Sequence, residues 1–371
     1  MTLARPGRCR RPRCGGQLPT NPVGAGAGPF QFSSFKPKEA IVLTRNPSYW
    51  GGDVYLEQLR FVNIIGGAAT YEALKAGTVN IAFMREPKAV TQAIDDGYAG
   101  FENVQNAGQI LLMNNGVEVT CQGGQPAVCA GQPDGTRFAT KTPTSSETVR
   151  QAIAAAINPE TIDQRENDGT GIPTTALFDE SFPWDPGVAG PEYDLDRAKS
   201  LVAQAKGEGW DGKVRLVCDN APTAQARALA IRTMLEAAGI ELAVTNDADV
   251  SGTIGAVITR KDYDLACWGL SVPGDDGAVF QVGYFFVSNG AANRTGYKNP
   301  EMDAALKQLR AASTDDERRS AYEEIAQLYT EDVPMLSLQA IREYIAWDDS
   351  VHGVVPNQGT QVFLDKTWIA S

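Results

Sequence analysis

Histidine is almost absent from this sequence: His352 is the only one among 371 residues. Because its ordinary pKa lies near neutrality, histidine is the usual general base of hydrolases and transferases. His352 stands in a polar stretch near the C-terminal end, where we expect a surface residue. No Gly-x-Ser-x-Gly nucleophile motif occurs either. A P-loop-like stretch at residues 207–214 has Val214 in place of the magnesium-binding hydroxyl. We therefore predict that the protein is not an enzyme and holds no cofactor or metal ion.

The sequence also lacks an apolar run long enough to cross a bilayer, although 43% of its residues are hydrophobic and can fill a large core. Acidic residues outnumber basic ones by 45 to 33, giving a formal net charge of −12. Five of the basic residues are arginines that precede residue 20. Without them, 28 basic residues face 45 acidic ones, and the remaining chain carries −17. Such a surface repels nucleic acids and anionic membranes, so we exclude nucleic acid as a partner.

The first twenty residues contain arginines but no apolar segment of the kind that follows the basic start of a secretory signal. Their Pro, Gly, Cys and Arg residues show no periodicity. We expect residues 1–20 to lie outside the fold. They are either a disordered tail or the product of a misplaced start or a truncation.

Six cysteines are present: Cys9, Cys14, Cys121, Cys129, Cys218 and Cys267. Cys121 and Cys129 bracket a loop rich in Gly and Gln, and this spacing favours a local disulfide over two free thiols. A disulfide would indicate an oxidising compartment. A zinc site would need four ligands, and no His or second close Cys pair lies nearby in the sequence. Cys218 and Cys267 stand in apolar runs, so we predict buried strand residues there.

Strands and helices alternate from residue 29 onward, which predicts an α/β fold with mixed sheets flanked by helices. We predict a buried strand at residues 60–65 and a helix opened by a capping box of Thr144 and Glu147. A second capping box pairs Thr314 with Glu317. Further strands are predicted at residues 29–35, 39–46, 79–83, 101–105, 108–115, 213–218, 240–244, 263–269, 334–339 and 343–347. Further helices are predicted over 68–76 and 87–96, after Asp194, over 224–238 and 251–260, and after Asn299.

Five short motifs follow one another in order, at residues 21–52, 74–82, 149–158, 193–201 and 293–303. Together they resemble the bacterial ABC-importer solute-binding proteins of family 5, the dipeptide- and oligopeptide-binding proteins. Two positions depart from the family pattern, with Asn80 in place of Asp and Leu195 in place of Pro. The resemblance extends from residue 21 to about residue 350.

The resemblance implies a two-lobed fold of the type II periplasmic-binding-protein class, in which both chain ends build one lobe. Residues 21–112 with 336–371 would form part of lobe I, and residues 113–335 would form lobe II. The family's lipoprotein signal and the opening portion of lobe I have no counterpart upstream of Asn21. We therefore expect an incomplete first lobe with exposed sheet edges, and a truncated or mis-started product of low stability. A cooperative melt of the purified chain, with no longer gene product detectable, would refute this hypothesis.

In relatives, an aromatic segment followed by acidic residues reaches the cleft, and a carboxylate there pairs with the ligand's ammonium group. Here Trp268 would be a stacking wall, and Asp275 or Asp276 the cation partner. The alternatives are core packing for Trp268 and a solvated turn for the two aspartates. The other predicted ligand-binding residues are Gly269, Ser271, Arg294, Met113 and Asn114, with a surface position as the alternative for Arg294.

The resemblance implies an extracytoplasmic solute-binding component of an ABC importer that delivers a peptide-like solute to permease subunits. We expect a monomer, periplasmic or extracellular and membrane-anchored as in the family. Nickel is disfavoured because imidazole ligands are nearly absent. Two alternatives stay open: a non-functional truncated fragment, and a glycosidase that uses Asp275 or Asp276.

Overall fold

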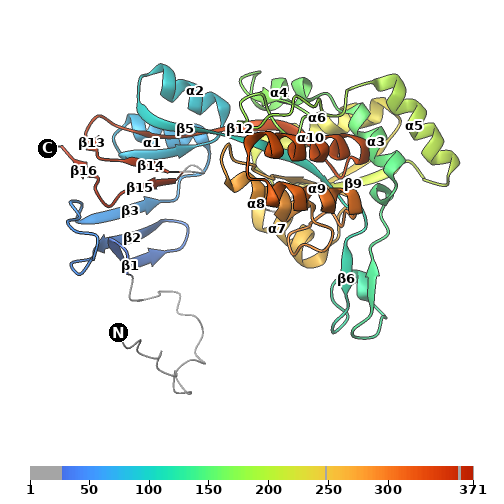
Figure 1. The fold of residues 1–371 in the computed structure, drawn as a ribbon, viewed down its shortest axis with the longest axis horizontal. Helices are drawn as coiled ribbons and strands as arrows, with labels where there is room; N and C mark the ends of the chain where they lie inside the picture. Colours follow the sequence, from blue (N-terminus) through green and yellow to red (C-terminus); the bar gives the residue numbers. More distant parts are fainter. Residues whose placement is uncertain (1–26, 247–248, 358–360, 371) are drawn as a thin grey trace. The chain divides into compact units, whose positions relative to one another are not determined.

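The computed structural model describes residues 27–246, 249–357 and 361–370, which form two compact units (Figure 1). The smaller unit combines residues 27–82 with residues 346–357 and 361–370, and the larger unit spans residues 83–345. The tail predicted at residues 1–20 lies outside the described residues. The predicted lobes, 21–112 with 336–371 against 113–335, stay a prediction.

The smaller unit contains a three-stranded antiparallel sheet of β1 (Phe30–Lys36), β2 (Ala40–Arg45) and β3 (Gln58–Val62). The predicted turn between the first two strands is present, with Lys38 in the left-handed region at φ 62°. Helix α1 (Gly67–Lys75) follows. Two short antiparallel pairs complete the unit: β13 (Val351–His352) with β16 (Trp368–Ile369), and β14 (Val355–Asn357) with β15 (Gln361–Phe363).

Two predictions in this unit need correction. The strand predicted to be buried at residues 60–65 is β3, which ends at Val62 and leaves Phe61 52% exposed. Among the described strands, β3 pairs only with β2, so it lies at the edge of this sheet. Its apolar residues reflect a preference for strand structure and not burial. His352 is half-buried in β13, and its ring lies 4.3 Å from that of Trp368. It therefore packs on an aromatic ring instead of extending freely from the surface.

A mixed sheet organises the larger unit. Its strand order is β10 (Glu241–Thr245), β9 (Lys213–Val217), β11 (Leu265–Trp268), β5 (Ala99–Met113), β12 (Met335–Trp347) and β4 (Ile81–Met84), with β8 (Ile172–Pro173) also paired to β12. β9, β10 and β11 are parallel, and β5 runs antiparallel to β11. β5 and β12 are each continuous where the sequence predicted two strands. Within β5, Ala107 has φ 46°, which locally interrupts the regular strand pattern.

Alternate residues of β5 enter two separate hydrophobic cores, as the two-residue period of a strand requires. Leu111 and Met113 pack with α3 (Glu147–Ala156), α5 (Leu195–Gly207) and α6 (Pro222–Ala237). Ile110 and Leu112 pack with α8 (Gly277–Phe286), α9 (Pro300–Ala311) and α10 (Asp315–Asp332). The remaining helices are α2 (Pro87–Asp95), α4 (Pro159–Glu166) and α7 (Val250–Ile254), the last continued by a π-helix over Gly255–Arg260. In the part of the chain that the structure describes, no helix has the length and apolarity of a membrane span.

The predicted helix caps are confirmed with one exception. Asp194 accepts a hydrogen bond from Arg197 N, Asn299 accepts from the start of α9, and Thr314 and Glu317 form the capping box of α10. The box of Thr144 with Glu147 is wrong. Instead a short 3₁₀ helix (Pro143–Ser145) begins after Thr142, and Ser146 precedes α3.

Two disulfides are present among the described residues. Cys121 and Cys129 are bonded, with Cα atoms 5.4 Å apart, in the loop between β6 (Glu118–Thr120) and β7 (Arg137–Ala139). These two strands form a hairpin that extends from the larger unit (Figure 1). Cys218 and Cys267 are buried as predicted, but they are also bonded to each other. Their Cα separation of 4.9 Å matches the spacing of neighbouring strands, because β9 and β11 pair directly.

Candidate functional site

The predicted ligand segment occupies the loop from the end of β11 to the start of α8. Trp268 is the last residue of β11, half-buried against the core that contains α8 to α10. Beyond it, the loop backbone is bonded to β5: Leu270 N donates to Ala107 O at 3.1 Å, and Val272 exchanges two 2.8 Å backbone hydrogen bonds with Asn106. The loop is therefore held against a central strand of the sheet.

Gly269 permits this close approach. A Cβ atom on Gly269 would lie 2.7 Å from the carbonyl oxygen of Gly108 in β5, a distance that real Cβ atoms essentially never show. Ser271 adopts the left-handed region at φ 56°, and its N–H donates to Ala107 O at 3.3 Å. The hydrogen bonds of Leu270 and Ser271 to Ala107 thus fix the loop backbone next to Gly269, and the side chain of Ser271 is half-buried.

The two aspartates differ in what they already bind. Asp275 Oδ1 accepts a 2.7 Å hydrogen bond from Gly277 N at the start of α8, and no ion pair joins Asp275 to another described residue. Asp276 is 70% exposed, and its Oδ1 lies 2.7 Å from Arg318 Nη1 of α10. Asp275 is therefore the carboxylate that lacks a cationic partner among the described residues.

Arg318 belongs to a polar and aromatic cluster that the sequence did not reveal. Its guanidinium carbon lies 5.0 Å above the ring of Trp184, whose Nε1 donates to Asp315 at 2.8 Å. The ring of Trp184 stacks at 6.1 Å on that of Tyr322. Because residues 184, 276 and 318 are far apart in sequence, no local motif could have brought them together.

Tyr322 is fully buried next to the two aspartates, and its hydroxyl has no hydrogen-bond partner among the described residues. Burial raises the pKa of Tyr322 well above its ordinary value; Arg318 opposes this rise, and the carboxylates of Asp276 and Asp275 add to it. The phenol therefore stays protonated and keeps its capacity to donate a hydrogen bond.

Arg294 makes its contacts elsewhere in the larger unit. Its Nη1 donates to Ala291 O at 3.1 Å, and its carbonyl accepts from the hydroxyl of Tyr263. Burial lowers the pKa of Lys261, and the charge of Arg294 lowers it further. No contact among the described residues joins Arg294 to the loop that follows Trp268.

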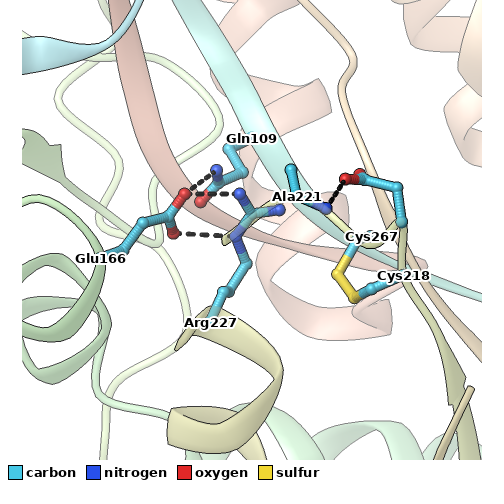
Figure 2. The surroundings of a disulfide bond; sticks show 7 residues. Gln109, Glu166, Cys218, Ala221, Arg227 and Cys267 are labelled. Carbon is cyan, nitrogen blue, oxygen red and sulfur yellow. Dashed lines mark hydrogen bonds and ion pairs between the residues drawn. A yellow bond between two sulfur atoms is a disulfide. The ribbon is translucent and has the colours of Figure 1, made fainter. Parts of the chain in front are cut away.

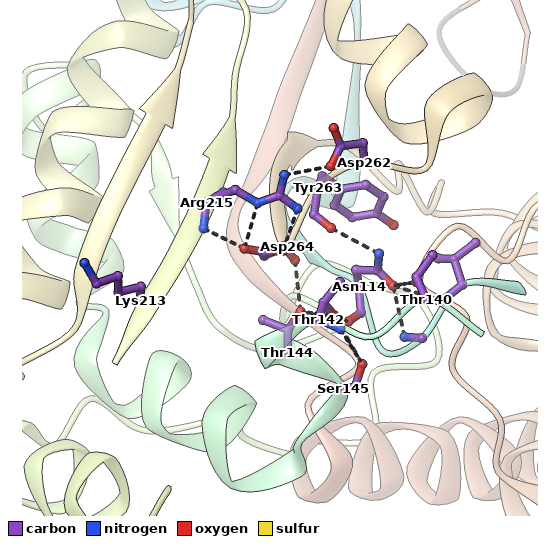
Figure 3. Close-up of polar contacts among 12 residues, drawn as sticks. Asn114, Thr140, Thr142, Thr144, Ser145, Lys213, Arg215, Asp262, Tyr263 and Asp264 are labelled. Atoms are coloured by element: carbon purple, nitrogen blue, oxygen red, sulfur yellow. Dashed lines mark hydrogen bonds and ion pairs between the residues drawn. The ribbon is translucent and has the colours of Figure 1, made fainter. Parts of the chain in front are cut away.

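Met113 and Asn114 are fully buried, so neither presents a group to a ligand in this structure. Met113 pairs with Leu265 in the sheet. The amide of Asn114 donates to Tyr263 O at 3.1 Å and accepts from Val117 N at 2.9 Å and from Thr140 Oγ1 at 3.1 Å (Figure 3). Asn114 thus organises the connection after β5.

A buried ion pair lies beside the second disulfide and was also not predicted. Arg227 Nε of α6 donates to Glu166 Oε2 at 2.8 Å, and Gln109 Nε2 of β5 donates to Glu166 Oε1 at 3.1 Å (Figure 2). The two charged side chains are only 10% and 4% exposed. The pair links α4, α6 and β5, which gives it a structural role. No group of three or more potential metal ligands occurs in the residues that the structure describes.

Comparison with known proteins identifies the family. Residues 14–292 match the model of the bacterial extracellular solute-binding proteins, family 5 (middle region), which covers more than half of the chain. The chain belongs to this family. Membership confirms the resemblance inferred from the five ordered motifs, and the family's members are solute-binding proteins and not enzymes.

Curated relatives in the family are distant in sequence and longer than this chain. The oligopeptide-binding protein AppA of Bacillus subtilis is 24% identical over 365 residues, which span 93% of this chain and 62% of AppA. The nickel-binding protein NikA of Staphylococcus aureus is 22% identical over 338 residues, which span 89% of this chain and 61% of NikA. The chain thus spans less than two thirds of the length of these relatives.

Solved structures confirm the fold class. AppA of Bacillus subtilis in complex with a nonapeptide superposes with a TM-score of 0.70 at 21% identity, covering 93% of this chain and 66% of AppA. AgaA of A. tumefaciens R10 in complex with agropinic acid superposes with a TM-score of 0.73 at 20% identity, covering 95% of this chain and 68% of AgaA. The prediction of an α/β fold of the periplasmic-binding-protein type is confirmed.

Proposed function

We propose that this protein is the extracytoplasmic solute-binding component of an ABC importer, capturing a peptide-like solute and delivering it to permease subunits. Family membership is the observation that carries the proposal. A periplasmic or extracellular location and a monomeric state belong to the same proposal. The two disulfides support such a location, because disulfides persist in oxidising compartments.

Asp275 is the proposed partner of the solute's ammonium group. Asp276 already pairs with Arg318, whereas Asp275 uses one oxygen to cap α8 and lacks an ion pair among the described residues. A charge-assisted hydrogen bond to an ammonium is worth about 1.5–3 kcal/mol, which corresponds to roughly a ten- to hundred-fold change in affinity. Trp268 and the backbone around Ser271, on the same loop, would line the binding site beside Asp275.

The glycosidase alternative is not favoured by this arrangement. That chemistry needs two carboxylates on opposite sides of a glycosidic bond, at a defined separation. Here the two aspartates are adjacent in sequence, one capping a helix and the other held by Arg318. The contacts within the protein thus account for the position of each aspartate without a catalytic role.

A peptide-binding experiment tests the proposal. The thermal midpoint of the purified protein is measured with trialanine, with N-acetyl-trialanine and with a maltose oligosaccharide. We expect trialanine to raise the midpoint, since a ligand at one hundred times its Kd stabilises the native state by about 2.7 kcal/mol. Acetylation removes the ammonium charge, so at the same concentration the stabilisation should fall to about 1.4 kcal/mol or less, and the shift in the midpoint should shrink accordingly. Equal shifts from both peptides would contradict recognition of the ammonium group.

Matched variants test which of the two aspartates binds the ammonium group. Asp275→Asn keeps the ability to cap α8 but removes the negative charge, so we expect affinity for trialanine to fall at least ten-fold. Asp276→Asn serves as the control, with an expected change below three-fold. The reverse order, measured by titration calorimetry, would assign the role to Asp276 instead.

A further inference from the structure

Helix α8 exposes a single stripe whose chemistry changes from acidic to aromatic. Asp276, Phe280 and Tyr284 are spaced four residues apart, so they lie on one helical face. Asp276 is 70% exposed, Phe280 66% and Tyr284 41%. On the opposite face, Ala278, Val282 and Phe286 are buried in the core. No charged residue occurs within Gly277–Phe286.

The two exposed rings form a preorganised pair. The rings of Phe280 and Tyr284 stack with centroids 5.3 Å apart and planes inclined by 18°. The ring of Phe285 meets that of Tyr284 edge-on at 6.2 Å. This stacking holds a flat apolar surface in place before any partner arrives, which reduces the entropy cost of binding.

We infer that this stripe binds an apolar, preferably aromatic, group of the same solute whose ammonium meets Asp275 just before α8. The inference rests on the proposed function and narrows its substrate class. Charge complementarity selects the occupant, because carboxylates and aromatic faces both attract cations and disfavour an anionic group. Asp275, which directly precedes the stripe, thus fixes the solute's amine, and the rings contact the side chain next to that amine.

Helix geometry sets where the apolar group lies in the solute. Phe280 follows Asp276 by four residues, about 6 Å along the helix axis, and Asp275 directly precedes Asp276. An extended peptide advances about 3.3–3.6 Å per residue. A peptide that extends along α8 with its amine at Asp275 would therefore place its first or second side chain beside the rings. Peptides with an aromatic residue there are the expected ligands, and peptides with an acidic residue there are disfavoured.

Four tripeptides test this preference: Phe-Ala-Ala, Ala-Phe-Ala, Ala-Ala-Ala and Ala-Asp-Ala. An aromatic contact is worth up to about 1.5 kcal/mol beyond its buried area, so we expect the better phenylalanine peptide to bind up to about ten-fold tighter than Ala-Ala-Ala. Phe280→Ala should reduce this ratio to below two-fold. Tyr284→Ala should reduce it in the same direction. The measurement is titration calorimetry on the purified protein.

Leu229→Ala is the matched control. Leu229 is 62% exposed on α6, on the other side of the sheet, so its removal should leave the ratio as in the unaltered protein. An aromatic preference that persists in both Phe280→Ala and Tyr284→Ala would overturn the inference. So would a self-associated protein that these variants convert to monomers in sedimentation, because the stripe would then be a contact between copies.

The result also separates this inference from the proposed function. Binding of all four tripeptides without an aromatic preference would overturn only the role of the stripe. Binding of none of them would overturn the peptide-binding proposal and the inference together.

Discussion

Thr144 carries a hydroxyl that solvent does not reach and that lies between two carbonyl oxygens. Its Oγ1 is 2.7 Å from Asn114 O and 3.1 Å from Asp264 O (Figure 3). The side chain therefore ties the end of β5 to the start of β11, and does not cap α3 as its spacing to Glu147 suggested. Local spacing indicates a cap correctly only where no buried acceptor competes for the hydroxyl.

Replacing Thr144 tests this assignment. Thr144→Val keeps the shape but removes one of the donors to Asn114 O and Asp264 O, which retain Thr142 Oγ1 and Asn114 N, so we expect the free energy of unfolding to fall by about 1 kcal/mol. Glu147→Gln is the control, with an expected change below about 0.5 kcal/mol because Glu147 is exposed and outside this network. Urea unfolding measures both. A larger loss for Glu147→Gln would restore the capping-box assignment.

The candidate site also shows how far local sequence patterns can predict side-chain contacts. Family resemblance predicted Trp268, Gly269, Ser271, Asp275 and Asp276, which the structure places together on one loop. It gave no sign of Arg318 or Trp184, because their approach to Asp276 depends on how α10 packs on the core. Side chains that meet through tertiary packing leave no trace in local spacing.

At the scale of single elements, the start of α10 combines a capping box with a measurable electrostatic signature. The carboxylate of Glu317 accepts from Ser313 N at 2.7 Å and from Thr314 N at 3.1 Å. The backbone hydrogen bond from Ser313 lowers the pKa of Glu317 below its ordinary value of 4.5, with smaller contributions from the Ser313 hydroxyl and from Thr314.

The pH dependence follows from the sign of this shift. Since the pKa in the folded state is depressed, the stabilisation is fully present above pH 4.5 and is lost as the pH falls through the lower folded value. We expect Glu317→Gln to melt below the unaltered protein at pH 7, with the difference shrinking as the pH falls below 4.5. Asp316→Asn, in the same first turn, controls for charge near the helix terminus. A difference in melting temperature that persists unchanged at pH 3 would contradict the assignment.

Caps and periodicity predicted α5, α9 and α10 closely, because each begins at a side chain that bonds its own first turn. α8 was missed for the opposite reason. It begins at Gly277 and is apolar on most of its surface, so neither a cap nor a polar face marks it. Because α8 contains no charged residue, its solvent-facing side includes an aromatic residue, Phe280.

At the scale of the whole molecule, the two disulfides stabilise chain segments of very different length. Cys121 and Cys129 are 8 residues apart, whereas Cys218 and Cys267 are 49 apart and join two paired strands of the central sheet. The loop-closure model gives about 2.5 kcal/mol for the short loop and about 4 kcal/mol for the long one. The sequence predicted the short pair from its spacing, but nothing local indicated that the distant pair would meet.

Reduction of one disulfide at a time tests whether the bond that closes the longer loop contributes more to the free energy of unfolding. In the double variant Cys121→Ala with Cys129→Ala, the bond of Cys218 with Cys267 is the disulfide left among the described residues, and the complementary variant leaves the short bond. Both variants also carry Cys9→Ala and Cys14→Ala, so that dithiothreitol acts on one bond in each. We expect reductant to lower the free energy of unfolding about 1.5 kcal/mol more in the first variant than in the second, since the longer loop frees more chain entropy in the unfolded state. Because each comparison is made within one variant, cavities left by the alanines cancel. Urea unfolding with and without reductant provides the measurement. A larger loss from the short bond would show that native packing around the hairpin, and not loop length, sets the contribution of each disulfide.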